Sequence, residues 1–235
     1  MTAPVVVLVG ADKGGVGKTF LSRVLLDYLA FNALPVRGFD TEGPLHRFYP
    51  TTTEVVDLTT AQDQMKVFDA LNSRVATVID IRAGLLSPTL RVLRDIGFLD
   101  QARAGGTVVI VLHVLGSNLD SLTEIEGTAD IVKGLSYFAV KNHVNAATFF
   151  EWDQKTNELF RDKIAGAITI PQLNERAVEA LEVAATPFSM FVDNKSAKGE
   201  PAEFSMVLRG YTAHWLKAVY SEFDRVKLAD KVRAP

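Results

Sequence analysis

The segment Gly10-Ala11-Asp12-Lys13-Gly14-Gly15-Val16-Gly17-Lys18-Thr19 decides the fold of this chain. It follows the apolar run Val5–Val9 and precedes a stretch of helical periodicity that begins at Gly17. Glycines let the backbone curl so that successive N–H groups point at one centre, and the following helix adds the positive end of its dipole. A strand, a glycine-rich bend and a helix in this order predict a phosphate-binding loop.

Two side chains at the end of this loop suit a nucleoside triphosphate. Lys18 is placed to neutralise the β- and γ-phosphates, and the Thr19 hydroxyl is placed to ligate Mg²⁺. The strict P-loop pattern has glycine where this chain has Asp12. The alternative is a glycine-rich turn that binds nothing, but strand, loop, Lys-Thr and helix all coincide here. The sequence therefore predicts a P-loop that binds ATP with Mg²⁺.

The length and composition fit one α/β domain. The chain has 235 residues, of which 48% are hydrophobic and 23% charged, and its formal net charge is −3. Any DNA contact would therefore need a local basic patch. The absence of cysteine excludes disulfides, thiolate zinc sites and iron–sulfur clusters. No basic region precedes Val5–Val9 and no apolar run reaches the roughly 18–20 residues of a spanning helix, so we expect a cytoplasmic protein.

Short apolar runs alternate with longer helical segments, which is the pattern of parallel βαβ units. We expect a single domain over residues 1–235, a three-layer, doubly wound, mostly parallel sheet with helices on both faces, in which residues 203–235 form a C-terminal helix and tail. The expected strands are Val5–Val9, Val36–Phe39, Val75–Asp80, Thr107–His113, Tyr137–Lys141 and Ala165–Ile170. The expected helices are Gly17–Phe31, Thr60–Leu71, Pro88–Leu99, Asn118–Lys133, Thr148–Phe160, Asn174–Val183 and Glu203–Val226.

Two of the expected strands end in aspartate. Asp40 follows Val36–Phe39, and Asp80 ends Val75–Asp80. Ligands of open parallel sheets bind at the carboxyl ends of the strands, so both acids could hold Mg²⁺ and its waters. The alternative for each aspartate is a helix cap or a turn residue.

These residues resemble the ParA/MinD family of deviant Walker A ATPases. The segment from Lys13 to Thr19 matches the family signature, which carries a second lysine near the start of the loop. Weaker matches follow in the right order, so that the resemblance covers about residues 5 to 190. Asp40 with Glu42 resembles the first switch, and Asp80-Ile81-Arg82-Ala83-Gly84 resembles the Walker B and second-switch segment. Tyr137–Asn142 resembles the strand that ends in an asparagine near the adenine. The Ile-Pro and helix segment near the C-terminus is matched by Ile170-Pro171 with Glu175, Val178, Glu179 and Ala180.

The resemblance implies a mechanism and a set of site residues. Two ATP-bound subunits would form a dimer with the nucleotides between them, and hydrolysis, slow and stimulated by a partner, would loosen it. Lys13 would reach the partner's phosphates, Asp40 would position or polarise the attacking water, and Asp80 would hold Mg²⁺ through water. The implied catalytic residues are Lys13, Lys18 and Asp40; the nucleotide-binding residues are Gly14, Gly15, Val16, Gly17, Lys18, Thr19, Phe20, Asn142 and Pro171; the metal ligands are Thr19, Asp40 and Asp80.

Two departures from the family lie in the switches. Family members commonly carry Asp-x-Asp-Pro-Gln where this chain has Asp40-Thr41-Glu42-Gly43-Pro44, and proline where it has Arg82. The sequence therefore predicts ATP binding more firmly than it predicts the hydrolysis rate or the choice of partner. The sequence leaves open whether Asn142 bonds the adenine or caps its strand, and whether Arg82 contacts phosphate, contacts a partner or is a surface arginine.

The first functional hypothesis is a ParA-like ATPase that partitions or positions DNA or another cargo. It implies a homodimer when ATP is bound, non-specific DNA as a matrix, association with the nucleoid, and an adaptor protein that stimulates hydrolysis. Candidate DNA contacts, which could equally be a solvated helix end, are Lys217, Arg225, Lys227, Lys231 and Arg233.

Three alternatives stay open. A MinD-like membrane switch is disfavoured because the end of the chain, residues 226–235, is short and lightly apolar. A dethiobiotin-synthetase-like ligase is faintly suggested by Gly10-Ala11-Asp12. An accessory ATPase of DNA transfer could use Phe149-Phe150-Glu151-Trp152 as a partner surface, although buried packing explains that cluster as well.

Overall fold

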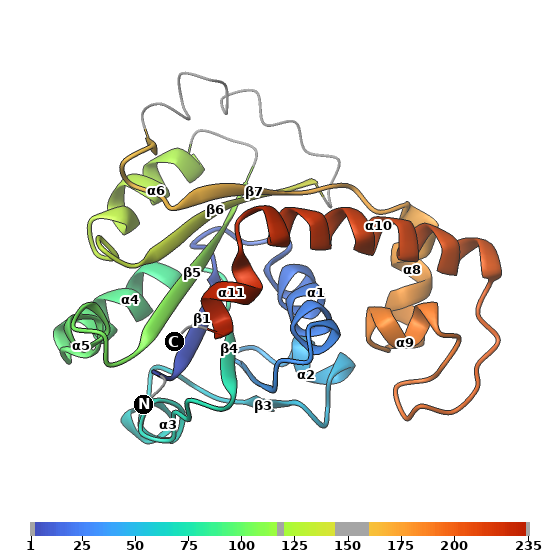
Figure 1. Ribbon diagram of the computed structural model, residues 1–235, viewed down its shortest axis with the longest axis horizontal. Coiled ribbons are helices and arrows are strands. Elements are labelled where there is room, and N and C mark those ends of the chain that lie inside the picture. The colour runs from blue at the N-terminus through green and yellow to red at the C-terminus, as the bar shows by residue number, and fades with distance from the viewer. Residues whose placement is uncertain (1–2, 117–119, 144–159, 234–235) are drawn as a thin grey trace.

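A single parallel sheet organises the chain, as the computed structural model of residues 3–116, 120–143 and 160–233 shows (Figure 1). Its order is β3-β2-β4-β1-β5-β6-β7, and every pairing between these strands is parallel. The strands are β1 Val5–Gly10, β2 Val36–Asp40, β3 Thr53–Val55, β4 Ala76–Asp80, β5 Val108–Leu115, β6 Ser136–Asn142 and β7 Gly166–Ile170. The predicted α/β fold is confirmed.

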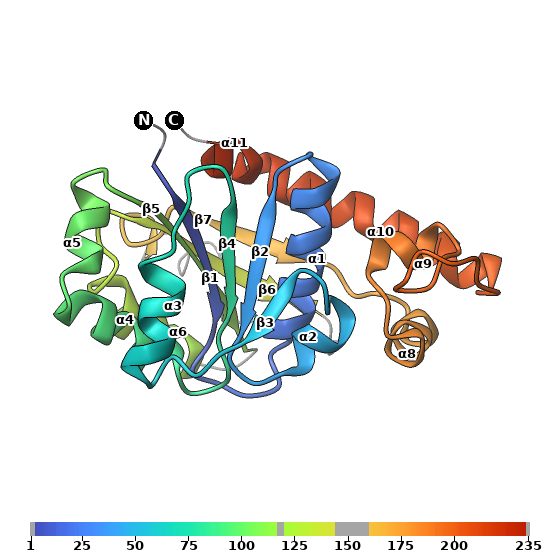
Figure 2. The same ribbon diagram turned by 90° about the horizontal axis from the view of Figure 1, so that it is seen from below.

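Helices cover both faces of the sheet, which makes three layers (Figure 2). Along β1, Val5, Val7 and Val9 point into one core, while Val6 and Leu8 point into the other. The first core is covered by α1 Lys18–Phe31, α2 Pro44–Phe48, α8 Glu175–Ala184, α9 Phe188–Val192, α10 Met206–Arg225 and α11 Leu228–Arg233. The second is covered by α3 Ala61–Phe68, α4 Leu86–Asp95, α5 Phe98–Arg103 and α6 Asp120–Ala129.

The structure corrects several element boundaries. The helix expected over Pro88–Leu99 is two helices, because Gly97 adopts a φ of 78° between α4 and α5. The expected tail forms α11, whose side chains Leu228, Ala229 and Val232 are buried. Short elements were missed, since the three to five residues of β3, α2 and α9 carry no readable periodicity. Apart from Phe160, the expected helix Thr148–Phe160 lies outside the described residues, as does the aromatic cluster at 149–152.

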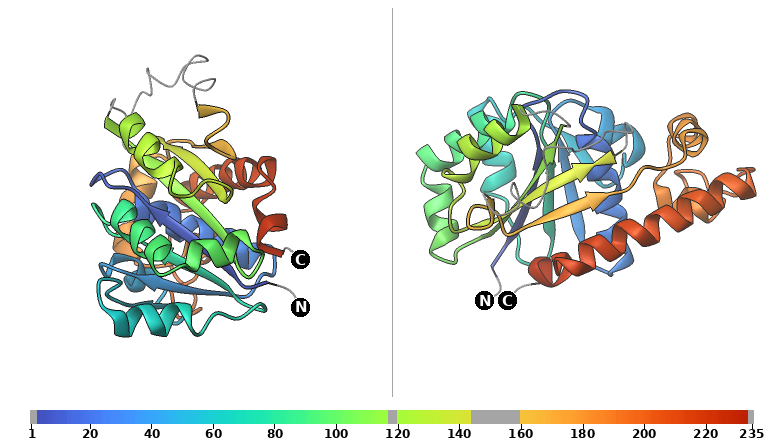
Figure 3. Two further views of the ribbon diagram at one scale, coloured as in Figure 1. Left: turned by 90° about the vertical axis from the view of Figure 1, so that its left-hand side faces the viewer. Right: turned by 90° about the horizontal axis from the view of Figure 1, so that it is seen from above.

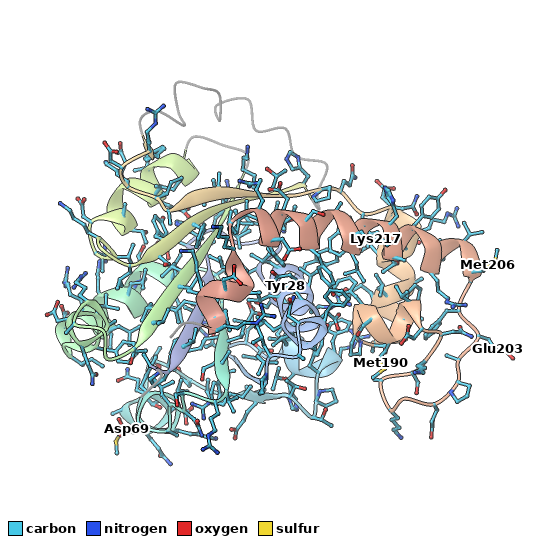
Figure 4. The ribbon with its side chains drawn as sticks, in the orientation of Figure 1. Tyr28, Asp69, Met190, Glu203, Met206 and Lys217 are labelled. Carbon is cyan, nitrogen blue, oxygen red and sulfur yellow. The ribbon has the colours of Figure 1, made fainter. Side chains whose placement is uncertain are left out.

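One part of the chain projects beyond the edge of the sheet (Figure 3). This helical arm, residues 172–212, comprises α8, α9 and the N-terminal part of α10. Met206 lies at its outer tip, and Asp69 marks the opposite side of the molecule (Figure 4). None of the helices in the described part of the chain is long and apolar enough to cross a bilayer.

Candidate phosphate-binding site

The loop between β1 and α1 has the backbone that its glycines predict. Gly15 has a φ of 72° and Gly17, the N-cap of α1, a φ of 86°, a region that residues with a Cβ rarely adopt. No atom lies within 4 Å of a Cβ built on Gly15, so conformation rather than crowding requires glycine there. Gly14 and Gly15 are exposed, whereas Val16 is buried under the loop. The exposed loop backbone therefore leads directly into the N-terminus of a 14-residue helix.

The loop is held in place from both sides. A Cβ on Gly10 would meet Leu86 Cδ1 at 2.9 Å, so β1 ends in close contact with α4. The Asp12 carboxylate accepts hydrogen bonds from Ser87 N, at 2.9 Å, and from the Ser87 hydroxyl. Asp12 thus caps the first turn of α4, whose own N-cap residue has no side-chain hydrogen bond. This contact gives a structural reason for aspartate at a position where the strict pattern has glycine.

Lys18 folds back over the loop. Its side chain is buried, and Nζ donates to the Lys13 carbonyl at 3.2 Å. Burial lowers the pKa of Lys18, and the nearby Asp80 carboxylate opposes that shift. The Lys13 side chain is partly exposed and forms no ion pair with any residue that the structure describes. One ammonium group therefore lies inside the loop and the other is directed to its surface.

Asp80 is the acid closest to the loop hydroxyls. Thr19 Oγ1 donates to Asp80 Oδ2 at 2.7 Å, and Ser22 Oγ donates to Asp80 Oδ1 at 2.9 Å. Burial raises the pKa of Asp80 to about 7, and repulsion from Asp40 adds to the shift, while the two hydroxyls and Lys18 oppose it. A hydroxyl and a carboxylate in contact are the hard oxygen donors that Mg²⁺ takes alongside phosphate, so these two residues fit a Mg²⁺ site.

Asp40 lies directly beside Asp80 but has different partners. The two residues face each other in the register of β2 and β4. Asp40 Oδ1 accepts from Glu42 N at 2.9 Å and Gly43 N at 2.8 Å, and Oδ2 accepts from His46 N at 3.0 Å. Such contacts are those of a helix cap or turn residue, which was the alternative to a Mg²⁺ ligand for this aspartate. Because each carboxylate oxygen can accept about two hydrogen bonds, one acceptor site remains on Oδ2.

Comparisons with known proteins identify the fold. No family model matches the sequence, and a search of curated proteins finds no significant match. Among solved structures, a nucleotide-binding protein from Archaeoglobus fulgidus in complex with ADP is similar with a TM-score of 0.50 and 17% identity, over 76% of this chain and 86% of that one. The MinD cell division protein of Aquifex aeolicus is similar with a TM-score of 0.50 and 13% identity, over 92% and 97%. The chain has the fold of the MinD-type P-loop ATPases.

Within the MinD-type fold, the two segments that resemble switches are joined by one threonine. Thr41 donates to the Asp80 carbonyl from its N, at 3.0 Å, and from its Oγ1, at 3.1 Å. Arg82 N donates to Thr41 Oγ1 at 2.8 Å, while the Arg82 side chain is exposed. Sequence reasoning missed Thr41; the signal was a hydroxyl directly after a strand-ending aspartate. A shift of one segment without the other would therefore break these hydrogen bonds.

Three residues that the family resemblance assigned to the nucleotide make contacts within the chain, and their contacts with nucleotide stay predictions. The Phe20 ring packs on Phe188 and Trp215, each at 5.2 Å between centroids, so only the Phe20 backbone N–H in the first turn of α1 remains a candidate ligand. The Pro171 carbonyl accepts from Trp215 Nε1 at 2.7 Å. Asn142 Nδ2 donates to the carbonyls of Val16, at 3.1 Å, and Gly17, at 3.2 Å. Asn142 thus supports the loop from behind, and its contact with adenine stays a prediction.

The described residues contain no group of three or more acidic or histidine side chains that could hold a metal ion alone. A Mg²⁺ at Thr19 and Asp80 would therefore depend on phosphate oxygens for further ligands. Metal and nucleotide would then bind as one unit.

Proposed function

We propose that this protein is a ParA-like ATPase, which binds Mg-ATP at residues 10–19, pairs with a second copy around the nucleotides, and hydrolyses ATP as a switch that positions DNA or another cargo. The observation that carries the proposal is the contact of Thr19 with Asp80 at the foot of a glycine loop that encloses Lys18. The fold and this contact support nucleotide binding most directly, and each further step rests on the family resemblance.

Different groups of the loop would bind different parts of the triphosphate. Backbone N–H groups from Gly14 to Thr19 would donate to phosphate oxygens, and Lys18 would exchange the Lys13 carbonyl for the β- and γ-phosphates. Mg²⁺ would neutralise phosphate charge between the Thr19 hydroxyl and a water held by Asp80. Lys18, whose pKa burial lowers, would regain a favourable environment beside these anions.

Two residues would carry the step from binding to turnover. Asp40 would orient the attacking water with the one acceptor site that its backbone contacts leave on Oδ2. Lys13, whose ammonium group no described residue pairs, would reach the phosphates of the partner subunit, where a cation stabilises the transferring phosphoryl group. Dimer formation would thereby depend on bound ATP.

The candidate basic patch at the C-terminal end is only partly available to DNA. Arg225 is paired with Glu222 at 2.8 Å and donates to the Ala167 carbonyl, and Arg233 donates to Asn32. Lys217 and Lys227 are also exposed, and neither forms an ion pair with a residue that the structure describes (Lys217 is labelled in Figure 4). Two separated lysines favour weak, salt-sensitive contact with a duplex over base-specific recognition.

The membrane alternative is disfavoured by the position of α11. Its apolar side chains, Leu228, Ala229 and Val232, are packed against the core. An interfacial helix needs a free apolar face, and this one is already buried.

Calorimetry tests the first step of the proposal. Wild-type protein should take up Mg-ATP, and Lys18→Ala should weaken that uptake at least about tenfold, because it removes the cation that faces the phosphates. Lys13→Ala is the matched control: it should bind nucleotide like wild type but fail to dimerise with ATP in analytical ultracentrifugation and to turn ATP over. If wild-type protein takes up no adenine nucleotide, the whole proposal is wrong; if Lys13→Ala dimerises normally, only the role of Lys13 is wrong.

A further inference from the structure

Asp12, the residue before Lys13, is tied to the helix α4. Its carboxylate accepts hydrogen bonds from the Ser87 backbone N–H, at 2.9 Å, and from the Ser87 hydroxyl. The Ser87 hydroxyl also lies 3.3 Å from Oγ1 of Thr128 on α6, a side chain that is fully buried. The partner of Asp12 is thus held inside the fold, so that Asp12 joins the phosphate loop to the packed interior.

The second-switch segment, residues 80–84, runs along the loop next to this contact. Gly84 N donates to the Ala11 carbonyl at 3.3 Å. A Cβ built on Gly84 would lie 4.0 Å from the Asp12 carbonyl oxygen, so the two backbones are close together. The loop and the segment that leads into α4 therefore pack as one unit, and Asp12 contributes side-chain hydrogen bonds to it.

The backbone around Lys13 has an anchor on each side. The Lys13 carbonyl accepts from Lys18 Nζ at 3.2 Å, and the preceding side chain, Asp12, bonds to Ser87. Under the proposed function, Lys18 exchanges the Lys13 carbonyl for phosphate oxygens when the nucleotide binds. Of these two anchors, the contact between Asp12 and Ser87 then remains, and it holds Lys13 in the state in which the Lys13 ammonium group is used.

We propose that Asp12 is a positioning residue: through Ser87 it holds Lys13 so that the Lys13 ammonium group can reach the phosphates bound by a second copy of the chain. This inference rests on the proposed function, because it takes Lys13 to act across the dimer. It adds that α4 sets the position of Lys13, so a shift of α4 would move the ammonium group with it. A displacement of about 1 Å at a reacting centre can lower a rate about 100-fold.

Substitution of Asp12 tests the contact. Asp12→Ala removes both hydrogen bonds but no group proposed to bind nucleotide, so the affinity for Mg-ATP should stay within about threefold of wild type. Because Lys13 would no longer be held, ATP-dependent dimerisation and phosphate release should each fall at least about tenfold. Asp12→Asn should retain both activities, because its amide oxygen can accept from Ser87 N and its NH₂ group can donate to Ser87 Oγ.

A cap of the same kind on another helix gives a matched control. The Thr60 side chain accepts from Asp63 N, at 3.3 Å, at the start of α3. Thr60→Ala should lower thermal stability about as much as Asp12→Ala does, but it should leave dimerisation and phosphate release unchanged. If Asp12 only capped α4, the two variants would behave alike in every assay.

Mixed dimers separate an effect on the partner's nucleotide from an effect on the subunit's own nucleotide. An Asp12→Ala subunit keeps Lys18 and binds ATP, while a Lys18→Ala subunit binds ATP weakly but keeps Asp12 and Lys13. In the mixed dimer, ATP on the first subunit meets a correctly held Lys13 from the second. Phosphate release by the mixture should therefore exceed the sum of the separate proteins at least about threefold. Lys13→Ala mixed with Lys18→Ala is the positive control, since the second subunit supplies an intact Lys13 in the same way.

The results distinguish a failure of this inference from a failure of the proposed function. Wild-type dimerisation and phosphate release by Asp12→Ala, with Lys13→Ala inactive, would overturn the role of Asp12 and leave the proposed function standing. An inactive Asp12→Ala protein that the mixture does not restore would place its effect in its own subunit, which also overturns the inference. Normal dimerisation by Lys13→Ala would remove the role of that lysine, and the inference with it. If thermal unfolding shows that Asp12→Ala does not fold, Ser87→Ala, which keeps the backbone contact, takes its place in the mixture and is read in the same way.

Discussion

Asp40 and Asp80 end neighbouring strands and face each other in the sheet register, yet they are held in opposite ways. Both are buried, with exposed fractions of 0% and 3%. Three backbone N–H groups donate to Asp40, and they fix the turn that leads into α2. Two side-chain hydroxyls, those of Thr19 and Ser22, donate to Asp80.

The difference separates a carboxylate that shapes the backbone from one that is free to change partners. Backbone N–H groups cannot turn away, so Asp40 is required for the local fold whatever else it does. A hydroxyl can accept as well as donate, so Thr19 can offer its lone pairs to a cation while Asp80 remains the acceptor of its proton. The same substitution should therefore reduce stability at Asp40 and reduce binding of Mg-nucleotide at Asp80.

Asp40→Asn should have the largest effect. An amide offers one acceptor oxygen, so its NH₂ group would face at least one of the three backbone N–H groups, and a buried donor would lose its partner. We expect the free energy of unfolding to fall by about 2–4 kcal/mol. Urea unfolding of the apo protein measures it. A loss below about 1 kcal/mol would mean that the turn before α2 does not depend on Asp40.

Asp80→Asn should leave the fold intact but weaken binding of Mg-nucleotide. The variant removes the negative charge nearest to Thr19, and loss of such a group that holds a metal or its waters typically costs about 10–100-fold in affinity. Calorimetry with ATP, with and without Mg²⁺, measures it, and affinity for metal-free ATP should change little. Equal affinities of wild type and variant for Mg-ATP would remove Asp80 from the site.

The pH dependence of stability should differ between wild type and Asp80→Asn. Burial raises the pKa of Asp80 to about 7 in the folded state, above the ordinary value of about 3.9 in the unfolded chain. The folded state therefore binds more protons between about pH 4 and 7, so this group makes wild-type stability fall as pH rises through that window. The variant lacks that contribution, and its stability relative to wild type should rise by about 3 kcal/mol from pH 5 to pH 8.

Urea unfolding of both proteins at the two pH values measures this difference. Burial also raises the pKa of Asp27, but that group is present in both proteins and cancels in the comparison. A relative stability that is the same at pH 5 and pH 8 would show that Asp80 ionises normally in the folded protein.

Ser22→Ala should have the smallest effect. It removes one of the two hydroxyls that donate to Asp80 and leaves the Thr19 contact in place. We expect a loss of about 1 kcal/mol in the free energy of unfolding, the net value of a typical hydrogen bond. A loss as large as that of Asp40→Asn would mean that Asp80 is as structural as its neighbour.

The sequence predicted those features of the fold and site that local patterns encode. The central strands and the phosphate loop follow from apolar runs and glycine spacing, and the strand-ending positions of Asp40 and Asp80 follow from the same runs. The sequence could not show which atoms would donate to each aspartate, because Thr19 and Asp80 lie 61 residues apart. For Phe20, helical periodicity could not tell whether the side chain faces the nucleotide or the core, and tertiary packing against Trp215 decides it.

The hydrogen bonds from Asn142 to Val16 and Gly17 have a consequence for synthesis. The glycine loop leaves the ribosome early, but the side chain that supports its carbonyls follows 126 residues later. At about 5–20 residues per second, roughly 6–25 s pass between the two. Throughout that interval the loop of the nascent chain lacks the hydrogen bonds from Asn142. The nascent chain should therefore begin to bind nucleotide only after Asn142 has been added, and not when the loop itself emerges.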